Sequence, residues 1–181
     1  MPEAPFEAAL RTFTAERRYG NAVVARWQAL APADGEALLE LARELRLGEH
    51  QLRDLWDWAE EIAARDRLSL ARVLALEPVR LGRRARHVGR NDKLRLVKTA
   101  LRRLRFPELA ATEERLTAMV RALRLPRNVR VSFPEFLEGD ELRVEIVADS
   151  VAALAAAAER IGAAAETATC KAIFRLLGEA P

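Results

Sequence analysis

The stretch NVRVSFPEFLEGDELRVEIVADSVAALAAAAERI, residues 128–161, decides the fold, because the spacing of apolar residues changes here from a helical to a strand period. Apolar and polar side chains alternate over 129–133 and again over 142–148, which is typical of strands with one apolar face. Pro134 interrupts the first run, and Glu138, Gly139 and Asp140 form a turn signal before the second. The stretch therefore predicts a β-hairpin.

A helix is expected directly after the hairpin, with Asp149 or Ser150 as its cap. Its apolar residues should face the hairpin; they are Val151, Leu154, Ala158 and Ile161. Two strands and one helix are too small to be stable alone. This unit must therefore pack either on the rest of the chain or on a second copy. In the second case the expected homodimer contacts include Val144, Ile146 and Leu154.

The order of these elements also resembles a known family. The segments NVRVSF, GDELRVEIVADS and VAALAAAAERI give strand, turn, strand and helix in the order of the C-terminal dimerisation domain of the ParB chromosome-partition family. The resemblance implies assembly about a two-fold axis, with DNA contact nearby that is independent of base sequence. Gly82, Arg83 and Arg84 echo the nucleotide-binding arginine motif of that family but lack its glutamate.

Residues 1–126 show a helical period throughout. Asp34, Ser69 and Thr112 are expected to cap three of the helices, and Pro78 and Pro107 are expected to end two others. We predict a mostly α protein, with an N-terminal body of about seven helices over 1–126. A small α+β unit of β-hairpin and helix follows over 127–181 as a dimerisation module.

A basic segment runs from Arg80 to Arg105, RLGRRARHVGRNDKLRLVKTALRRLR. It holds eleven Lys and Arg and one acid, a balance of +10, whereas the whole chain carries only +3. The rest of the chain therefore sums to −7. A basic segment in an acidic body indicates a site for an anionic partner, although a solvated arginine-rich flank would look the same.

The two halves of this segment differ. The first half, with Gly82 and Gly89, is expected to be a flexible arm or loop. The second half is a predicted helix on which Arg95, Lys98, Arg102 and Arg105 share a solvent-facing stripe. The candidate nucleic-acid-binding residues are Arg80, Arg83, Arg84, Arg86, Arg90, Lys93, Arg95, Lys98, Arg102 and Arg105.

The third and fourth predicted helices, joined through Leu47, Gly48 and Glu49, have the pattern of a helix-turn-helix. Five acids against two arginines over 49–65 argue against DNA reading by this pair. Trp58 falls on the polar side of the fourth helix, where an exposed indole is a candidate interface residue.

Three functions stay open on this basis. The first is a nucleic-acid-binding accessory protein that contacts the phosphate backbone of duplexes in preference to single strands, without reading base sequence. The second is an interaction adaptor that docks an acidic protein on the same basic segment. The third is an enzyme whose site is assembled from distant residues, which one sequence does not reveal.

Few residues suggest a cofactor or a reaction. His50 and His87 have no partners at metal-ligand spacing, so no metal is expected, and no phosphate-cradling glycine motif or other cofactor signal occurs. No apolar run is long enough to span a membrane. The N-terminus does not resemble a secretion signal, and Cys170 is the only cysteine, so we expect a cytoplasmic protein.

Overall fold

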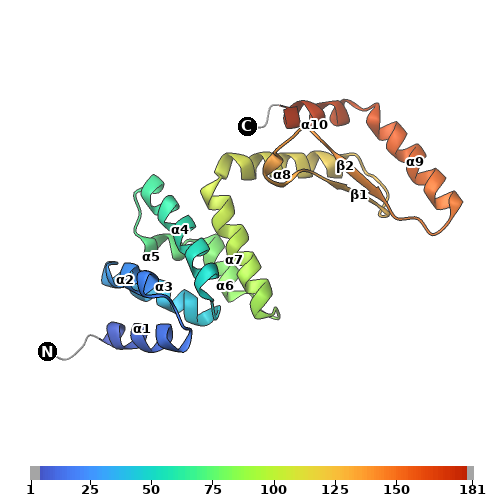
Figure 1. The fold of residues 1–181 in the computed structure, drawn as a ribbon. Coiled ribbons are helices and arrows are strands. Elements are labelled where there is room, and N and C mark those ends of the chain that lie inside the picture. Colours follow the sequence, from blue (N-terminus) through green and yellow to red (C-terminus); the bar gives the residue numbers. More distant parts are fainter. Residues whose placement is uncertain (1–4, 179–181) are drawn as a thin grey trace. The chain divides into compact units, whose positions relative to one another are not determined.

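The computed structural model describes residues 5–178 and divides into two compact units that meet between Arg105 and Phe106. Within these residues the chain forms ten α-helices and one two-stranded antiparallel sheet (Figure 1). The predicted fold class, mostly α with a small β-hairpin followed by a helix, is confirmed.

Unit 1 consists of seven helices around one apolar core. They are α1 (Pro5–Glu16), α2 (Asn21–Gln28), α3 (Pro32–Glu44), α4 (Glu49–Asp66), α5 (Leu70–Leu74), α6 (Glu77–Arg84) and α7 (Arg90–Arg105). The rings of Trp27 and Trp56 lie 5.9 Å apart in this core and are fully buried. Because α4 packs on both α5 and α7, it is the central support for the basic segment.

Residues 80–84 of the basic segment belong to helix α6, so the prediction of an arm or loop is wrong for them, and only residues 85–89 form a loop before α7. Pro78 lies in the first turn of α6 rather than ending a helix, a position where proline suits helical geometry. Gly82 lies where α6 meets α7, and a Cβ at this position would lie 3.1 Å from the backbone nitrogen of Val97. The glycine therefore permits a close helix contact instead of a loop.

The predicted helix caps have mixed outcomes. Ser69 and Ser150 are N-caps, and their hydroxyls accept hydrogen bonds from the backbone N–H groups of Arg72 and Ala153. Asp34 is not a cap, because α3 begins two residues earlier at Pro32. Its carboxylate instead accepts a hydrogen bond of 2.8 Å from the backbone N–H of Ala71, which links α3 to α5.

Unit 2 begins with α8 (Pro107–Ala122), which starts at its proline and not at Thr112. The structure assigns α8 to the same unit as the hairpin, whereas the sequence placed it in the helical body. The other elements are β1 (Val129–Ser132), the 3₁₀ turn η1 (Glu135–Leu137), β2 (Arg143–Ile146), α9 (Val151–Ala165) and α10 (Ala168–Gly178). Their core is formed by Leu116, Leu137, Ile173 and Leu177.

The strands pair with Val131 opposite Val144 and Arg130 opposite Glu145, so the predicted hairpin is present.

The predicted packing of α9 is wrong. Val151 is 85% exposed and Leu154 is 48% exposed, whereas Ala157 is buried. The buried residues of α9 are Ala157 and Ala164, whereas Ile161 is half-buried and Val151 and Leu154 are left exposed. No helix in residues 5–178 is long and apolar enough to cross a membrane.

Candidate nucleic-acid interface

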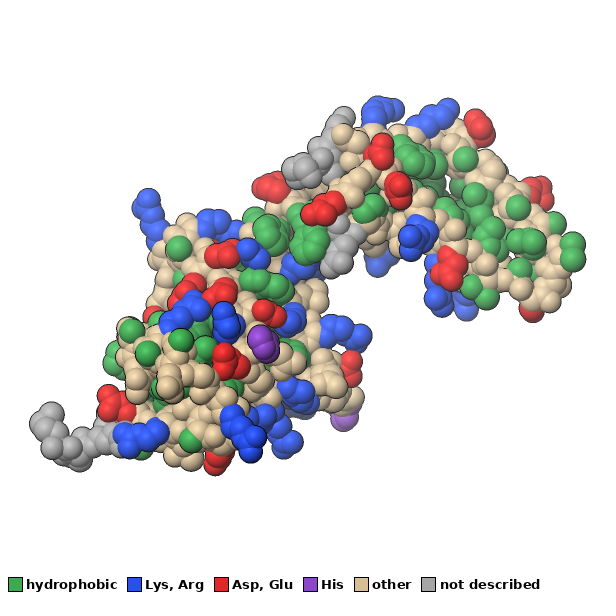
Figure 2. All heavy atoms as spheres, in the orientation of Figure 1, with side chains coloured by type: hydrophobic (Ala, Val, Ile, Leu, Met, Phe, Trp, Pro, Cys, Tyr) green, Lys and Arg blue, Asp and Glu red, His purple; other side chains and the backbone are tan. Residues whose placement is uncertain are grey.

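All ten predicted binding residues lie in unit 1, on α6, on α7 and on the loop between them. Figure 2 shows Lys and Arg side chains of unit 1 interspersed with Asp and Glu on the visible face. Several cations of the segment are held by acids or carbonyl groups of the same unit.

Arg83 is held most completely by acids of the same unit. Its Nη2 lies 2.9 Å from the Glu40 carboxylate and its Nε lies 2.7 Å from that of Glu44, both on α3. The Arg83 side chain is only 14% exposed. This arginine attaches α6 to α3 and cannot at the same time neutralise a phosphate.

Arg90 is held by backbone carbonyl groups. Its Nε donates to the Leu45 carbonyl at 2.7 Å and its Nη2 to the Arg46 carbonyl at 2.9 Å. These carbonyl groups lie just after the end of α3, where helix geometry leaves carbonyl groups without a helical partner. The arginine therefore completes the turn between α3 and α4.

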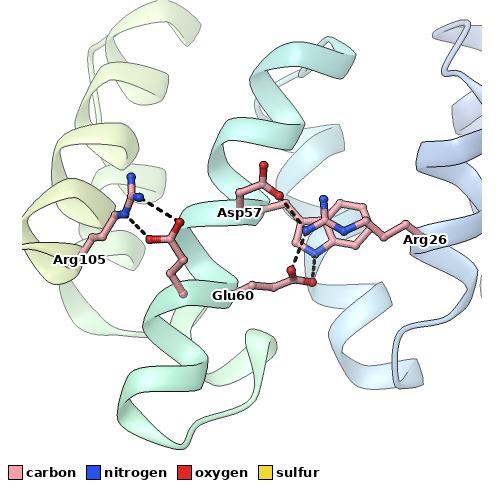
Figure 3. Close-up of polar contacts among 6 residues, drawn as sticks. Arg26, Asp57, Glu60 and Arg105 are labelled. Carbon is pink, nitrogen blue, oxygen red and sulfur yellow. Dashed lines mark hydrogen bonds and ion pairs between the residues drawn. The ribbon is translucent and has the colours of Figure 1, made fainter.

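Two residues of the predicted stripe are paired with acids of α4. The Lys98 Nζ lies 3.1 Å from the Asp54 carboxylate, and Arg105 Nη2 donates to Glu61 at 2.9 Å (Figure 3). Lys98 and Arg102 are both half-buried. The expectation that they face solvent is wrong, because α7 turns this side towards α4.

The ion pairs of α4 also explain its acidic sequence. On the side facing α2, Arg26 lies 2.7 Å from Asp57 and 2.6 Å from Glu60, with its guanidinium 4.2 Å from the centre of the Trp56 ring (Figure 3). These carboxylates raise the pKa of Arg26 against the opposing effect of burial. The acids of α4 hold α2 on one side and α7 on the other. We therefore describe α4 as a structural helix and not as a DNA-recognition helix.

Trp58 is half-buried, so the expectation of an exposed indole is wrong. The Lys98 Nζ lies 5.8 Å from its ring centre, and the Arg105 guanidinium carbon lies 5.9 Å from it. The ring also packs against the core of unit 1. Trp58 is therefore a packing residue between α4 and α7.

The other predicted interface residues lie in unit 2, where Val144 is 38% exposed and Ile146 is half-buried.

A subset of the segment is exposed to solvent, apart from its Lys93, which is half-buried. Within residues 5–178, no acidic partner is recorded for Arg80, Arg84, Arg86 and Lys93. Arg95, whose side chain is 77% exposed, pairs only with Asp92 on its own helix. We call these five residues, Arg80, Arg84, Arg86, Lys93 and Arg95, the open basic surface. Arg80 and Arg84 line a hollow together with Glu40 and Glu44, and both of these carboxylates form their ion pairs with Arg83.

A surface hollow of about 690 Å³ lies next to Arg90 and is missing from the sequence prediction. Arg17, Arg46 and His50 line it together with the first turn of α4, whose N-cap is Gly48. Backbone N–H groups at a helix start carry partial positive charge, which adds to that of the arginines. One acid, Glu49, also lines the hollow, and its carboxylate accepts a hydrogen bond from the Gly20 N–H.

Sequence reasoning missed Arg17 and Arg46 because both lie far from the basic segment in the chain. The only local signal is Gly48, which marks the turn before α4 without showing what lies beside it. No group of three His, Cys, Asp or Glu in the described part of the chain could hold a metal ion.

Comparisons with known proteins give no relative for this arrangement. No family model matches the chain, and no curated protein or solved structure matches it.

Proposed function

We propose that unit 1 binds the phosphate backbone of duplex nucleic acid through the open basic surface, without reading base sequence. One observation carries this proposal: among residues 5–105, the cations of the open basic surface have no acidic partner on another element, although neighbouring cations of the segment do. An uncompensated cation can release condensed counterions from a phosphate chain, which is the main source of such binding. The proposed setting is the cytoplasm, where the free thiol of Cys170 would stay reduced.

The shape of the surface favours backbone contact over base reading. The cations are spread over the end of α6, the loop and the first turns of α7. Arg80 and Arg84 are four residues apart and share one face of α6. His87 is the one ring in the sequence between these cations, whereas proteins that bind single strands interleave several rings for base stacking. Duplex is therefore the preferred partner.

The proposal is tested by fluorescence anisotropy with labelled duplexes of unrelated sequence. Four phosphate contacts would weaken binding roughly a hundredfold between about 50 and 200 mM salt. We expect this steep dependence and similar affinities for all sequences. Absence of binding at the lower salt concentration, or an affinity that salt does not change, would refute the proposal.

A second candidate, docking of an acidic protein segment, is favoured by apolar residues beside the cations. Leu81 is 62% exposed, Leu96 is 41% exposed and Val88 is 39% exposed. Phosphates do not need such neighbours, whereas an acidic amphipathic helix would cover both kinds of side chain. Leu81→Ser with Leu96→Ser separates the two candidates: it should leave duplex affinity unchanged and weaken the binding of an acidic amphipathic peptide.

We also propose that unit 2 forms a homodimer. Its sheet has only two strands of four residues, and Val147 and Val151 are 58% and 85% exposed. Figure 2 shows hydrophobic side chains gathered over the part of unit 2 that contains α9. A dimer would also double the number of phosphate contacts for each particle. Light scattering of the whole chain at tens of micromolar is the direct measurement, and a monomer mass at that concentration would refute this proposal.

A further inference from the structure

The outer edge of β2 has unused hydrogen-bonding groups. In an antiparallel pair, successive residues turn their N–H and C=O groups alternately towards the neighbouring strand and away from it. The Val147 N–H donates to the Asn128 carbonyl at 2.9 Å, so residue 147 is turned towards β1. By alternation, the backbone N–H and C=O groups of Arg143 and Glu145 also point towards β1. Those of Val144 and Ile146 point away from β1, to the outer edge of the sheet. Within residues 5–178, β2 pairs with no strand other than β1.

We propose that this edge pairs with β2 of a second copy, antiparallel and centred on Val144. The inference rests on the proposed homodimer and adds the strand, the register and the residues that select it. The N–H and C=O groups of Val144 would bond to those of the same residue in the second copy. The result is a four-stranded sheet in the order β1, β2, β2, β1, which is large enough to be stable where one hairpin is not.

Charge selects the register. Centring on Val144 places Arg143 opposite Glu145 of the second copy, and the two-fold axis repeats this pair. Centring on Arg143 would place two arginines opposite each other, and centring on Glu145 would place two glutamates opposite each other. Like charges directly opposite destabilise a sheet, whereas opposite charges stabilise it. Of these three registers, only the one centred on Val144 has complementary charges.

The apolar face supports the same register. Val144 would lie opposite its own equivalent, and Leu142 would lie opposite Ile146 of the second copy. Both Leu142 and Ile146 are half-buried, and Val144 is 38% exposed. On the opposite face Glu145 would lie between Arg130 of its own hairpin and Arg143 of the second copy. The combined sheet therefore keeps one apolar face and one face of alternating charge.

Two variants of the full chain with opposite charges test the register. Arg143→Glu leaves two acids beside Val144. The double change Arg130→Glu with Glu145→Arg leaves two arginines beside Val144 and preserves the opposite charges across β1 and β2. We expect wild type to be a dimer and the dissociation constant of each variant alone to rise by at least about tenfold. Mixing the two variants should restore a dimer containing one copy of each.

The outcomes separate the two proposals. If wild type is a monomer, the homodimer and the register are both wrong. If wild type is a dimer but neither variant weakens it, or the mixture forms no mixed dimer, the register is wrong and the homodimer stands. Mass measurement by native mass spectrometry distinguishes mixed from self-paired dimers when one variant carries an isotope label. Recovery in the mixture also shows that both variants are folded.

Discussion

The guanidinium of Arg90 donates a hydrogen bond of 3.0 Å to the side-chain oxygen of Gln51 and so joins the first turn of α7 to that of α4. Two helix starts, each with partial positive charge, are thereby brought to one part of unit 1. The cations that remain open lie on the same α6 and α7 segment. This arrangement separates arginines that hold the fold from arginines that can meet a partner, and the two groups should respond differently to substitution.

Reversing charge on the open basic surface should remove duplex binding without unfolding the protein. Arg84→Glu with Arg86→Glu changes two exposed side chains that form no ion pair with an acid among residues 5–178. We expect a loss of affinity of at least about tenfold and a change in stability within about 0.5 kcal/mol. Anisotropy and thermal unfolding measure the two effects. Arg72→Glu with Arg121→Glu is the control for net charge, and an equal loss of affinity in that control would contradict a localised site.

Removing Arg83 should have the opposite effect. Arg83→Ala leaves Glu40 and Glu44 side by side without their cation, and the arginine it removes is mostly buried. We expect a loss of about 1 to 3 kcal/mol in the free energy of unfolding, with little change in duplex affinity. Urea denaturation gives the first value. An unchanged stability together with lost binding would mean that Arg83 belongs to the binding surface instead.

Adding one methyl group at Gly82 should destabilise the contact between α6 and α7. The new Cβ would lie 3.1 Å from the Val97 backbone nitrogen and 3.2 Å from the Leu96 carbonyl carbon, and backbone atoms cannot move aside cheaply. Gly82→Ala should therefore cost about 1 to 3 kcal/mol. Gly162→Ala is the matched control, because nothing lies within 4 Å of its Cβ position. Helix propensity predicts a gain of roughly 0.5 to 1 kcal/mol there, so the two changes should shift urea denaturation in opposite directions.

Stability should fall in alkaline solution because of Tyr19. Burial raises the pKa of its phenol to about 12, and its hydroxyl donates a hydrogen bond of 2.9 Å to the Leu47 carbonyl. The unfolded chain loses this proton near pH 10, so between about pH 10 and 12 the folded state binds more protons and stability declines as pH rises. Tyr19 is the only tyrosine, so its ultraviolet difference spectrum reports the titration directly. Tyr19→Phe should flatten the pH dependence in this window, and a titration near pH 10 in the folded protein would contradict the prediction.

The sequence by itself determined the fold class and most of the elements. The change from a helical to a strand period at Val129 located the hairpin, because apolar spacing directly reflects which face of an element is buried. Ser69 was recognised as a cap, and Ser150 as one of two candidates, because capping is a local hydrogen bond between near neighbours. The concentration of cations over residues 80–105 was also visible without any structure.

Only the tertiary structure decided which of those cations are open. Arg83 and Lys98 are paired with Glu44 and Asp54, 39 and 44 residues away, and local charge counting cannot detect such partners. Gly82 looked like a loop signal because a glycine at a close helix crossing has the same local sequence as one in a turn. The exposure of Val151 was likewise decided by packing, since the helical period shows that a face is apolar but not which element covers it. Long-range pairing and close approach depend on how separate elements meet, and that information is not contained in any one segment of the chain.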